Sequence, residues 1–170
     1  MKKLLTFAVA LVAMALSSAS AQTINFNKSG EWWILPKFRE MVSITTDESV
    51  SAKPVIKFNV TDFGEEKFVS TSSTKSLATK FSAGTYEMTV KVFFVKAPAG
   101  FNVNVKNRDG EGFKATYIST KGLDSGKWVE VTKSVELTDI DDAQIIVSLN
   151  NTPRCGVGEF YVDEVTFVKK

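Results

Sequence analysis

The stretch Tyr86-Glu87-Met88-Thr89-Val90-Lys91-Val92 carries the clearest fold signal in the sequence. An apolar residue stands at every second position, and glutamate, threonine and lysine stand between them. Successive side chains of a β-strand point to opposite faces, so this period of two predicts a strand with one face in a core. The same alternation returns in residues 101–106, 128–137 and 145–149, which indicates that strands of this kind build the fold.

Turn residues separate the alternating segments, and glycine or proline stands in most of these turns, as in residues 97–100 and 109–112. No window of eleven residues has a helical stripe, so the predicted fold is all-β, a sandwich or barrel of short strands. The expected strands are Ile24–Phe26, Trp32–Leu35, Met41–Thr45, Pro54–Val60, Lys67–Ser70, Ser76–Phe81, Thr85–Val95, Phe101–Asn107, Lys114–Ser119, Trp128–Leu137, Gln144–Leu149 and Phe160–Val168.

Two places depart from the regular pattern. Residues 37–53 have the least clear alternation, and a long surface loop is the expectation for this region around its one short strand. Lys133 interrupts the apolar row of residues 128–137, so this strand is expected to bend or to reach a sheet edge there.

The first 21 residues have the pattern of an export signal. Lys2 and Lys3 form a positive start, Leu4–Leu16 is apolar except for Thr6, and Ala19-Ser20-Ala21 is a small-residue cleavage site. The apolar run is shorter than the ~20 residues that a membrane-spanning helix needs. We therefore expect a signal peptide over residues 1–21, one β-sandwich domain over residues 22–170, and a secreted or periplasmic product without a lipid-bearing cysteine.

Composition excludes several classes of function. The chain has no histidine, which removes Ser-His-Asp and Cys-His catalysis and histidine-ligated zinc. Its one cysteine, Cys155, cannot form an intramolecular disulfide and is expected to be buried. Lys2 and Lys3 belong to the signal, so residues 22–170 carry 19 basic and 19 acidic side chains, and binding of nucleic acid through a positive field is disfavoured.

Three segments resemble a known family. Gly84-Thr85-Tyr86-Glu87-Met88-Thr89-Val90, Gly126-Lys127-Trp128-Val129-Glu130-Val131 and Phe160-Tyr161-Val162-Asp163-Glu164-Val165-Thr166-Phe167 are similar, in order and spacing, to strands of jelly-roll carbohydrate-binding modules. The resemblance is to modules like those of families 4, 9 and 22, in the galactose-binding-domain-like superfamily. It implies a jelly-roll β-sandwich and a structural role for Trp128. The same sandwich also serves other functions.

The resemblance also implies a possible calcium ion at the sandwich edge. In the family, an acidic residue of the first strand and the aspartate of the closing strand help to hold it, and Asp163 matches the second position. The first strand departs from the family pattern, because Ile24-Asn25-Phe26-Asn27 has asparagine where glutamate is expected, and Glu31 is the candidate substitute. The alternative for Asp163 is a carboxylate that accepts hydrogen bonds from nearby backbone amides.

Candidate ligand-binding residues are aromatic rings and polar groups that suit a sugar. Trp32 and Trp33 are neighbours on a strand, so one is free to face solvent and stack on a sugar while the other enters the core. Amide and guanidinium groups match sugar hydroxyls. The further candidates are Arg39, Tyr117, Asn150, Asn151 and Arg154, each of which has a structural or solvated role as its alternative.

Three functions follow from these observations. The first is a non-catalytic module that binds a glycan or cell-surface polysaccharide. The second is a structural or protein-interaction domain whose partner is another envelope or matrix protein. The third is a small hydrolase using Asp139, Asp141 or Asp142, although acidic residues in such a turn are ordinarily solvated. Rings in a groove with polar flanks favour the first function, and a flat apolar patch favours the second.

Overall fold

The structure is a computed structural model that describes residues 21–25, 29–77 and 79–170. The predicted export signal lies outside the described residues except for Ala21. The strands are β1 (Ala21–Asn25), β2 (Trp32–Ile34), β3 (Val42–Asp47), β4 (Ser51–Val60), β5 (Phe68–Ser73), β6 (Thr79–Phe81), β7 (Gly84–Lys96), β8 (Gly100–Asn107), β9 (Lys114–Ser119), β10 (Trp128–Leu137), β11 (Ile140–Asn150) and β12 (Gly158–Lys169). Each expected strand overlaps one of these, which confirms the all-β prediction.

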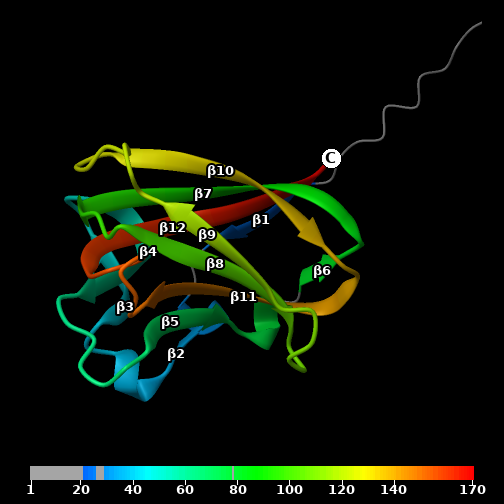
Figure 1. The fold of residues 1–170 in the computed structure, drawn as a ribbon, viewed down its shortest axis with the longest axis horizontal. Helices are drawn as coiled ribbons and strands as arrows, with labels where there is room; N and C mark the ends of the chain where they lie inside the picture. The colour runs from blue at the N-terminus through cyan, green and yellow to red at the C-terminus, as the bar shows by residue number, and fades with distance from the viewer. Residues whose placement is uncertain (1–20, 26–28, 78) are drawn as a thin grey trace, which may run out of the picture.

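The described strands form two antiparallel sheets packed face to face. Sheet A has the order β10-β7-β12-β4-β3, and β1 also pairs with β12. Sheet B has the order β2-β5-β11-β8-β9, and β6 also pairs with β11. Figure 1 shows β9, β8, β11, β5 and β2 side by side in this order. Strands that are distant in sequence are neighbours in both sheets, and the arrangement is the jelly-roll sandwich that the sequence predicts.

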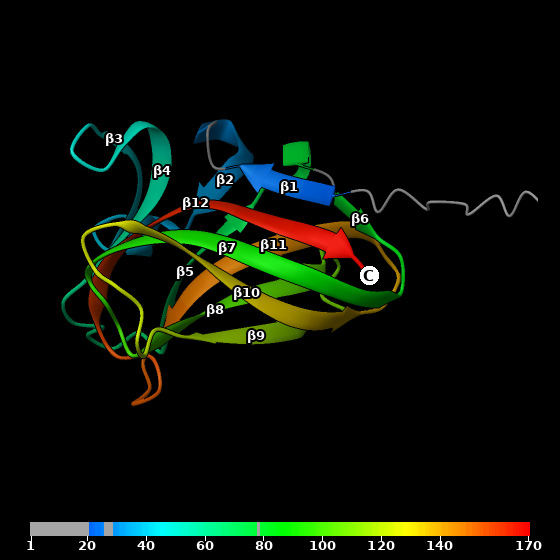
Figure 2. The same cartoon turned by 90° about the horizontal axis from the view of Figure 1, so that it is seen from above.

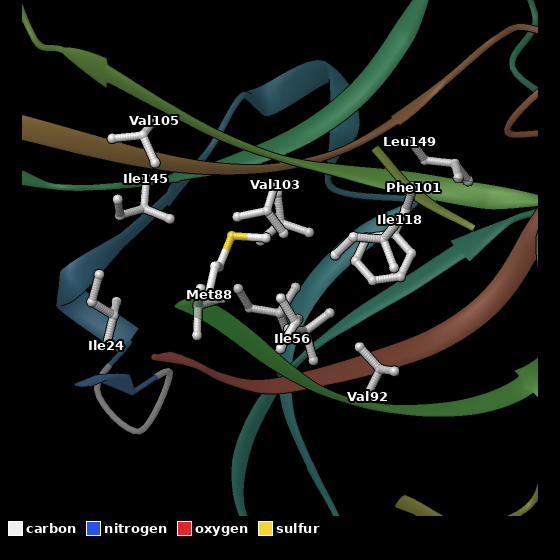
Figure 3. Close-up of a cluster of buried hydrophobic side chains, with 14 of the residues drawn as sticks. Ile24, Ile56, Met88, Val92, Phe101, Val103, Val105, Ile118, Ile145 and Leu149 are labelled. Carbon is white, nitrogen blue, oxygen red and sulfur yellow. The ribbon is translucent and has the colours of Figure 1, made fainter. Parts of the chain in front are cut away.

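The core lies between the two sheets and explains the alternation in the sequence. Met88 and Val92 of β7 and Ile56 of β4 lie opposite Phe101 and Val103 of β8 (Figure 3). Four buried phenylalanines extend this contact: Phe58 stacks on Phe160 at 4.8 Å between ring centroids, and Phe160 lies 5.3 Å from Phe101 in the other sheet. Phe94 lies 6.1 Å from Phe160. Cys155 is buried beside this core, as predicted.

Three short 3₁₀ helices are described: η1 (Ser29–Glu31), η2 (Pro36–Phe38) and η3 (Lys75–Leu77). No helix in the described ranges is long and apolar enough to cross a membrane. β10, which contains Lys133, is an edge strand of sheet A, in agreement with the expectation for this residue.

The expectation of a long surface loop over residues 37–53 is wrong. The segment contains the end of η2, all of β3 and the start of β4, and β3 pairs with β4 in a hairpin. Phe38 is buried, and so is Val42. The alternation was weak because β3 is the other edge strand of sheet A, where serine and threonine between the apolar residues are only partly buried.

Within sheet A, side chains of β12 and β10 bond to the turn of the β3–β4 hairpin (Figure 2). The Tyr161 hydroxyl donates to Asp47 Oδ2 at 2.8 Å, and Trp128 Nε1 donates to the Val50 carbonyl at 3.0 Å. The Trp128 ring also packs edge-on against Phe93 at 5.7 Å. Trp128 therefore has the structural role that the family resemblance implies.

The hydrogen bonds that Asp47 accepts in this turn favour its charged form. Hydrogen bonds from the Ser49 and Tyr161 hydroxyls hold the pKa of the Asp47 carboxyl below its ordinary value. A depressed pKa means that the stabilisation is present above the unfolded-state pKa, about 3.9, and is lost as pH falls through the folded-state value. We expect Asp47→Asn to lower the free energy of unfolding near neutral pH and to converge with the wild type in acid.

Urea denaturation at about pH 6 and about pH 3 measures this convergence. Glu48→Gln changes an exposed carboxylate of the same turn and is the matched control. A difference between Asp47→Asn and the wild type that stays constant over this range would contradict the assignment.

Candidate functional site

The outer face of sheet B is hollowed because small side chains occupy its middle. Ser70 of β5, Ser148 of β11 and Ala115 of β9 lie on this face, opposite in parity to the buried core residues of their strands. We call the depression the sheet B hollow. Its volume is about 340 Å³, and its lining residues are Phe68, Ser70, Asn102, Asn104, Phe113, Ala115, Ile146, Ser148 and Asn150.

Exposed aromatic rings stand around this hollow. Phe68 is 46 % exposed at the start of β5, and Phe113 is 59 % exposed just before β9. Trp33, 52 % exposed, is on the same face at the edge strand β2, in the cross-strand row that passes through Ser72 and Ile146 to Asn104. In the described part of the chain, the only other large exposed apolar residue is Val95, on β7 of sheet A.

Amide side chains form the floor of the sheet B hollow. Asn102 and Asn104 are consecutive outward residues of β8, and both are buried. Asn104 Nδ2 donates to Ser148 Oγ at 3.2 Å, whereas Asn104 Oδ1 is buried without a hydrogen-bond partner. The floor of the sheet B hollow is therefore polar.

A second depression adjoins the first and shares Asn102 and Asn150 with it. We call it the Tyr117 hollow; its volume is about 370 Å³, and Thr152, Pro153, Arg154 and Cys155 complete its lining with Tyr117 itself. It therefore brings together three predicted ligand-binding residues, Tyr117, Asn150 and Arg154. The three come from β9, from the end of β11 and from the loop before β12.

Tyr117 itself is held by its surroundings. Its hydroxyl donates to the carbonyls of Ala99 and Arg154, at 3.2 and 2.7 Å. The Arg154 guanidinium lies 4.0 Å from the ring centroid, and a Cβ added at Gly100 would overlap the ring. The ring is therefore partly covered, and it positions Arg154 rather than offering a free stacking surface.

The other predicted ligand-binding residues are distributed differently. Trp33 and Arg39 line a shallow hollow of about 350 Å³ at the β2 edge, together with Ser43. Trp32 also borders this hollow but packs into the core and is only 4 % exposed, so Trp33 is the member of the pair that faces solvent, and Trp32 offers no stacking surface. Asn151 Nδ2 donates to the Glu66 carbonyl at 3.2 Å and thereby fastens the loop before β12 to the loop before β5.

Two lysine side chains surround the carboxylate of Asp163, the predicted calcium ligand. Asp163 is buried on β12, and its two oxygens meet Lys53 at 2.8 Å and Lys91 at 3.1 Å, so ammonium groups already neutralise the carboxylate. Glu31 lies in η1, beside β2 of sheet B. The described residues contain no group of three or more acidic, cysteine or histidine side chains that could hold a metal. Calcium stays a prediction from the resemblance.

Sequence reasoning missed four central residues of the site: Phe68, Phe113, Asn102 and Asn104. The two asparagines carried a signal, because they stand at the polar positions that alternate with Phe101, Val103 and Val105. Asparagine has low strand propensity, and two of them on one face of a strand suggest a function for that face. Phe68 and Phe113 gave no such signal, since only the strand order brings them to one hollow.

Comparisons with known proteins agree on the fold. No protein-family model matches the sequence, and no curated protein matches it significantly. Among solved structures, the chain is similar to the ligand-free CBM1 module of BiXyn10A (TM-score 0.58, 12 % identity, 88 % of this chain and 97 % of that one). It is also similar to the C-terminal CBM6 of LamC, a marine laminarinase from Zobellia galactanivorans (TM-score 0.55, 14 % identity, 88 % and 100 %).

A third similar structure is an arabinose-bound α-L-arabinofuranosidase, MgGH51, with a TM-score of 0.59 and 13 % identity. The match covers 84 % of this chain but only 24 % of the enzyme. At such low identities the likeness concerns the fold. The chain has the jelly-roll sandwich found in carbohydrate-binding modules, and the resemblance inferred from its three sequence motifs is confirmed at that level.

Proposed function

We propose that this protein is an exported, non-catalytic carbohydrate-binding module, and that the sheet B hollow binds an oligosaccharide or a segment of a polysaccharide. One observation carries the proposal: Trp33, Phe68 and Phe113, the exposed large rings of the described chain, all lie on one sheet face around a floor of amides and hydroxyls. The similarity of the fold to carbohydrate-binding modules supports the same function.

The chemistry of the hollow suits a sugar. A sugar ring has an apolar face, which packs on an aromatic ring, and a rim of hydroxyls that both donate and accept hydrogen bonds. The asparagine amides and serine hydroxyls of the floor also do both.

The same features argue against the two alternatives. A protein-binding patch is expected to be flat and apolar, whereas polar side chains flank the rings here. A hydrolase of glycosides needs a pair of carboxyl groups, and neither aspartate nor glutamate lines the sheet B hollow. The turn acids have structural contacts elsewhere: Asp139 accepts from the Ala83 amide at 2.8 Å, and Asp142 pairs with Arg108 at 3.3 Å.

Calorimetric titration of residues 22–170 with a panel of plant, microbial and host polysaccharides tests the proposal. We expect binding to at least one of them with a dissociation constant between roughly 1 mM and 1 μM, because a shallow hollow buries little surface. Each titration is repeated with calcium and with chelator, which tests the calcium prediction at the same time. The absence of binding throughout the panel under both conditions would refute the proposed function.

A further inference from the structure

Two cationic side chains without acidic partners flank the amide floor of sheet B. Lys106 follows Asn104 on the outward side of β8, in register with Gln144 of β11. Arg154 covers Tyr117, which is in register with Asn102 at the other end of the floor. In the described part of the chain, neither residue forms an ion pair.

Several cations elsewhere on the sandwich have carboxylate partners. On the outer face of sheet A, Lys57 pairs with Glu159 at 2.7 Å, and Lys53 and Lys91 share Asp163. Arg108, near the edge of sheet B, is satisfied by Asp142 and by the carbonyls of Ser73 and Thr74. Lys106 and Arg154 share the lack of an ion pair with other exposed cations of the described chain, such as Lys96 and Lys133, and they differ from these in standing at the two ends of the amide floor.

No carboxylate lines the sheet B hollow or the Tyr117 hollow; Arg154 lines the second, and Lys106 stands one outward position beyond Asn104 of the first. The linings therefore carry no negative charge to offset these cations on the surface where the proposed function places the ligand. Hydrogen bonds from ammonium and guanidinium groups to carboxylate or sulfate oxygens are stronger than those to neutral hydroxyls.

From this charge pattern, which rests on the proposed function, we infer that the glycan is anionic and bears carboxylate or sulfate groups that Lys106 and Arg154 receive. Asn102 marks the Arg154 end of the floor, because it is in register with Tyr117. Lys106 and Asn102 are four residues apart on β8, so their Cα atoms are about 13 Å apart. This span exceeds one sugar ring, and the two cations contact charged groups on different sugars of one chain. A free inorganic anion would meet only one of them at a time.

The test compares glycans that differ only in charge. The carboxylate arm uses oligogalacturonate and its fully methyl-esterified form, and the sulfate arm uses a sulfated galactan and its desulfated form. We expect the charged member of at least one pair to bind about tenfold more tightly than its neutral form. We also expect this advantage to shrink as salt rises from about 0.05 M to about 0.5 M, because salt screens exposed charges.

Variants assign the effect to the two residues. We expect Lys106→Gln and Arg154→Gln each to weaken binding of the anionic glycan about five- to tenfold, with little change for a neutral glycan. Lys106→Arg and Arg154→Lys keep the charge and are expected to retain most of the affinity. Lys96→Gln removes an exposed lysine at the end of β7, in sheet A, and is the matched control.

The outcomes separate the inference from the proposed function. Equal binding of charged and neutral glycans would overturn the inference and leave the proposed function standing. So would a preference for charge that Lys106→Gln and Arg154→Gln leave intact. Binding to no glycan of either kind would overturn both.

Discussion

Glycan affinity should fall about tenfold to about a hundredfold when Phe68 and Phe113 are both replaced by alanine. Each exposed ring contributes about 0.5–1.5 kcal/mol when a flat apolar surface stacks on it, and the two contributions combine in the double variant. Phe68 begins β5 and Phe113 directly precedes β9, and both line one hollow, so they contact different parts of a bound oligosaccharide. Calorimetry with the best ligand of the panel measures the loss.

The fold should survive this change. Phe113 is mostly exposed, and Phe68 gives up an edge contact with Phe38 at 5.8 Å, a pair that contributes about 0.5–1.5 kcal/mol of stability. Val95→Ala removes an exposed apolar side chain from sheet A and is the matched control. If the double variant binds like the wild type, or if Val95→Ala weakens binding as much, the sheet B hollow is not the binding site.

Phe160→Ala should destabilise the protein by about 3–5 kcal/mol, a large share of the total stability of a domain. Phe160 is fully buried and stacks face to face on Phe58 within sheet A. It also contacts Phe101 of sheet B, so its loss leaves a cavity at the place where the two sheets meet. Urea denaturation of the wild type and the variant gives the difference in unfolding free energy.

Two further substitutions show whether the loss comes from the cavity. Phe160→Leu fills part of the space and is expected to cost less than the alanine variant. Thr166→Ala changes a partly buried residue of the same strand, β12, and is expected to have a small effect. A loss below about 1 kcal/mol for Phe160→Ala would show that the phenylalanine cluster does not join the sheets as described.

The strands were predictable because each has one face in the core, and apolar residues therefore stand at every second position of the sequence. The prediction failed where that cause is absent. β11 begins at Ile140, although the predicted strand began at Gln144. The prediction missed this part because Asp141 and Asp142 interrupt the apolar alternation, and the pairing of β11 with β6 shifts register between Ile140 and Ala143. Both strands of the β3–β4 hairpin were expected, but the residues around and between them were expected to form a long loop, because an edge strand buries its residues only in part.

The site was predictable only in part, since it depends on contacts between distant segments. The resemblance directed attention to polar groups in loops, and Tyr117, Asn150 and Arg154 do meet in one hollow. Phe68 begins β5 and Phe113 directly precedes β9, and β11 and β8 lie between these two strands in sheet B. Alternation shows which side chains share a face of one strand, but strand order is set by the whole fold.

The most direct test of the central claim is to follow backbone and side-chain amide signals of ¹⁵N-labelled protein by NMR during titration with the glycan that binds best. We expect the largest shifts along β5, β8, β9 and β11, including the side-chain amides of Asn102 and Asn104. Shifts confined to the outer face of sheet A, where Tyr161 and Asp163 lie, would contradict the claim.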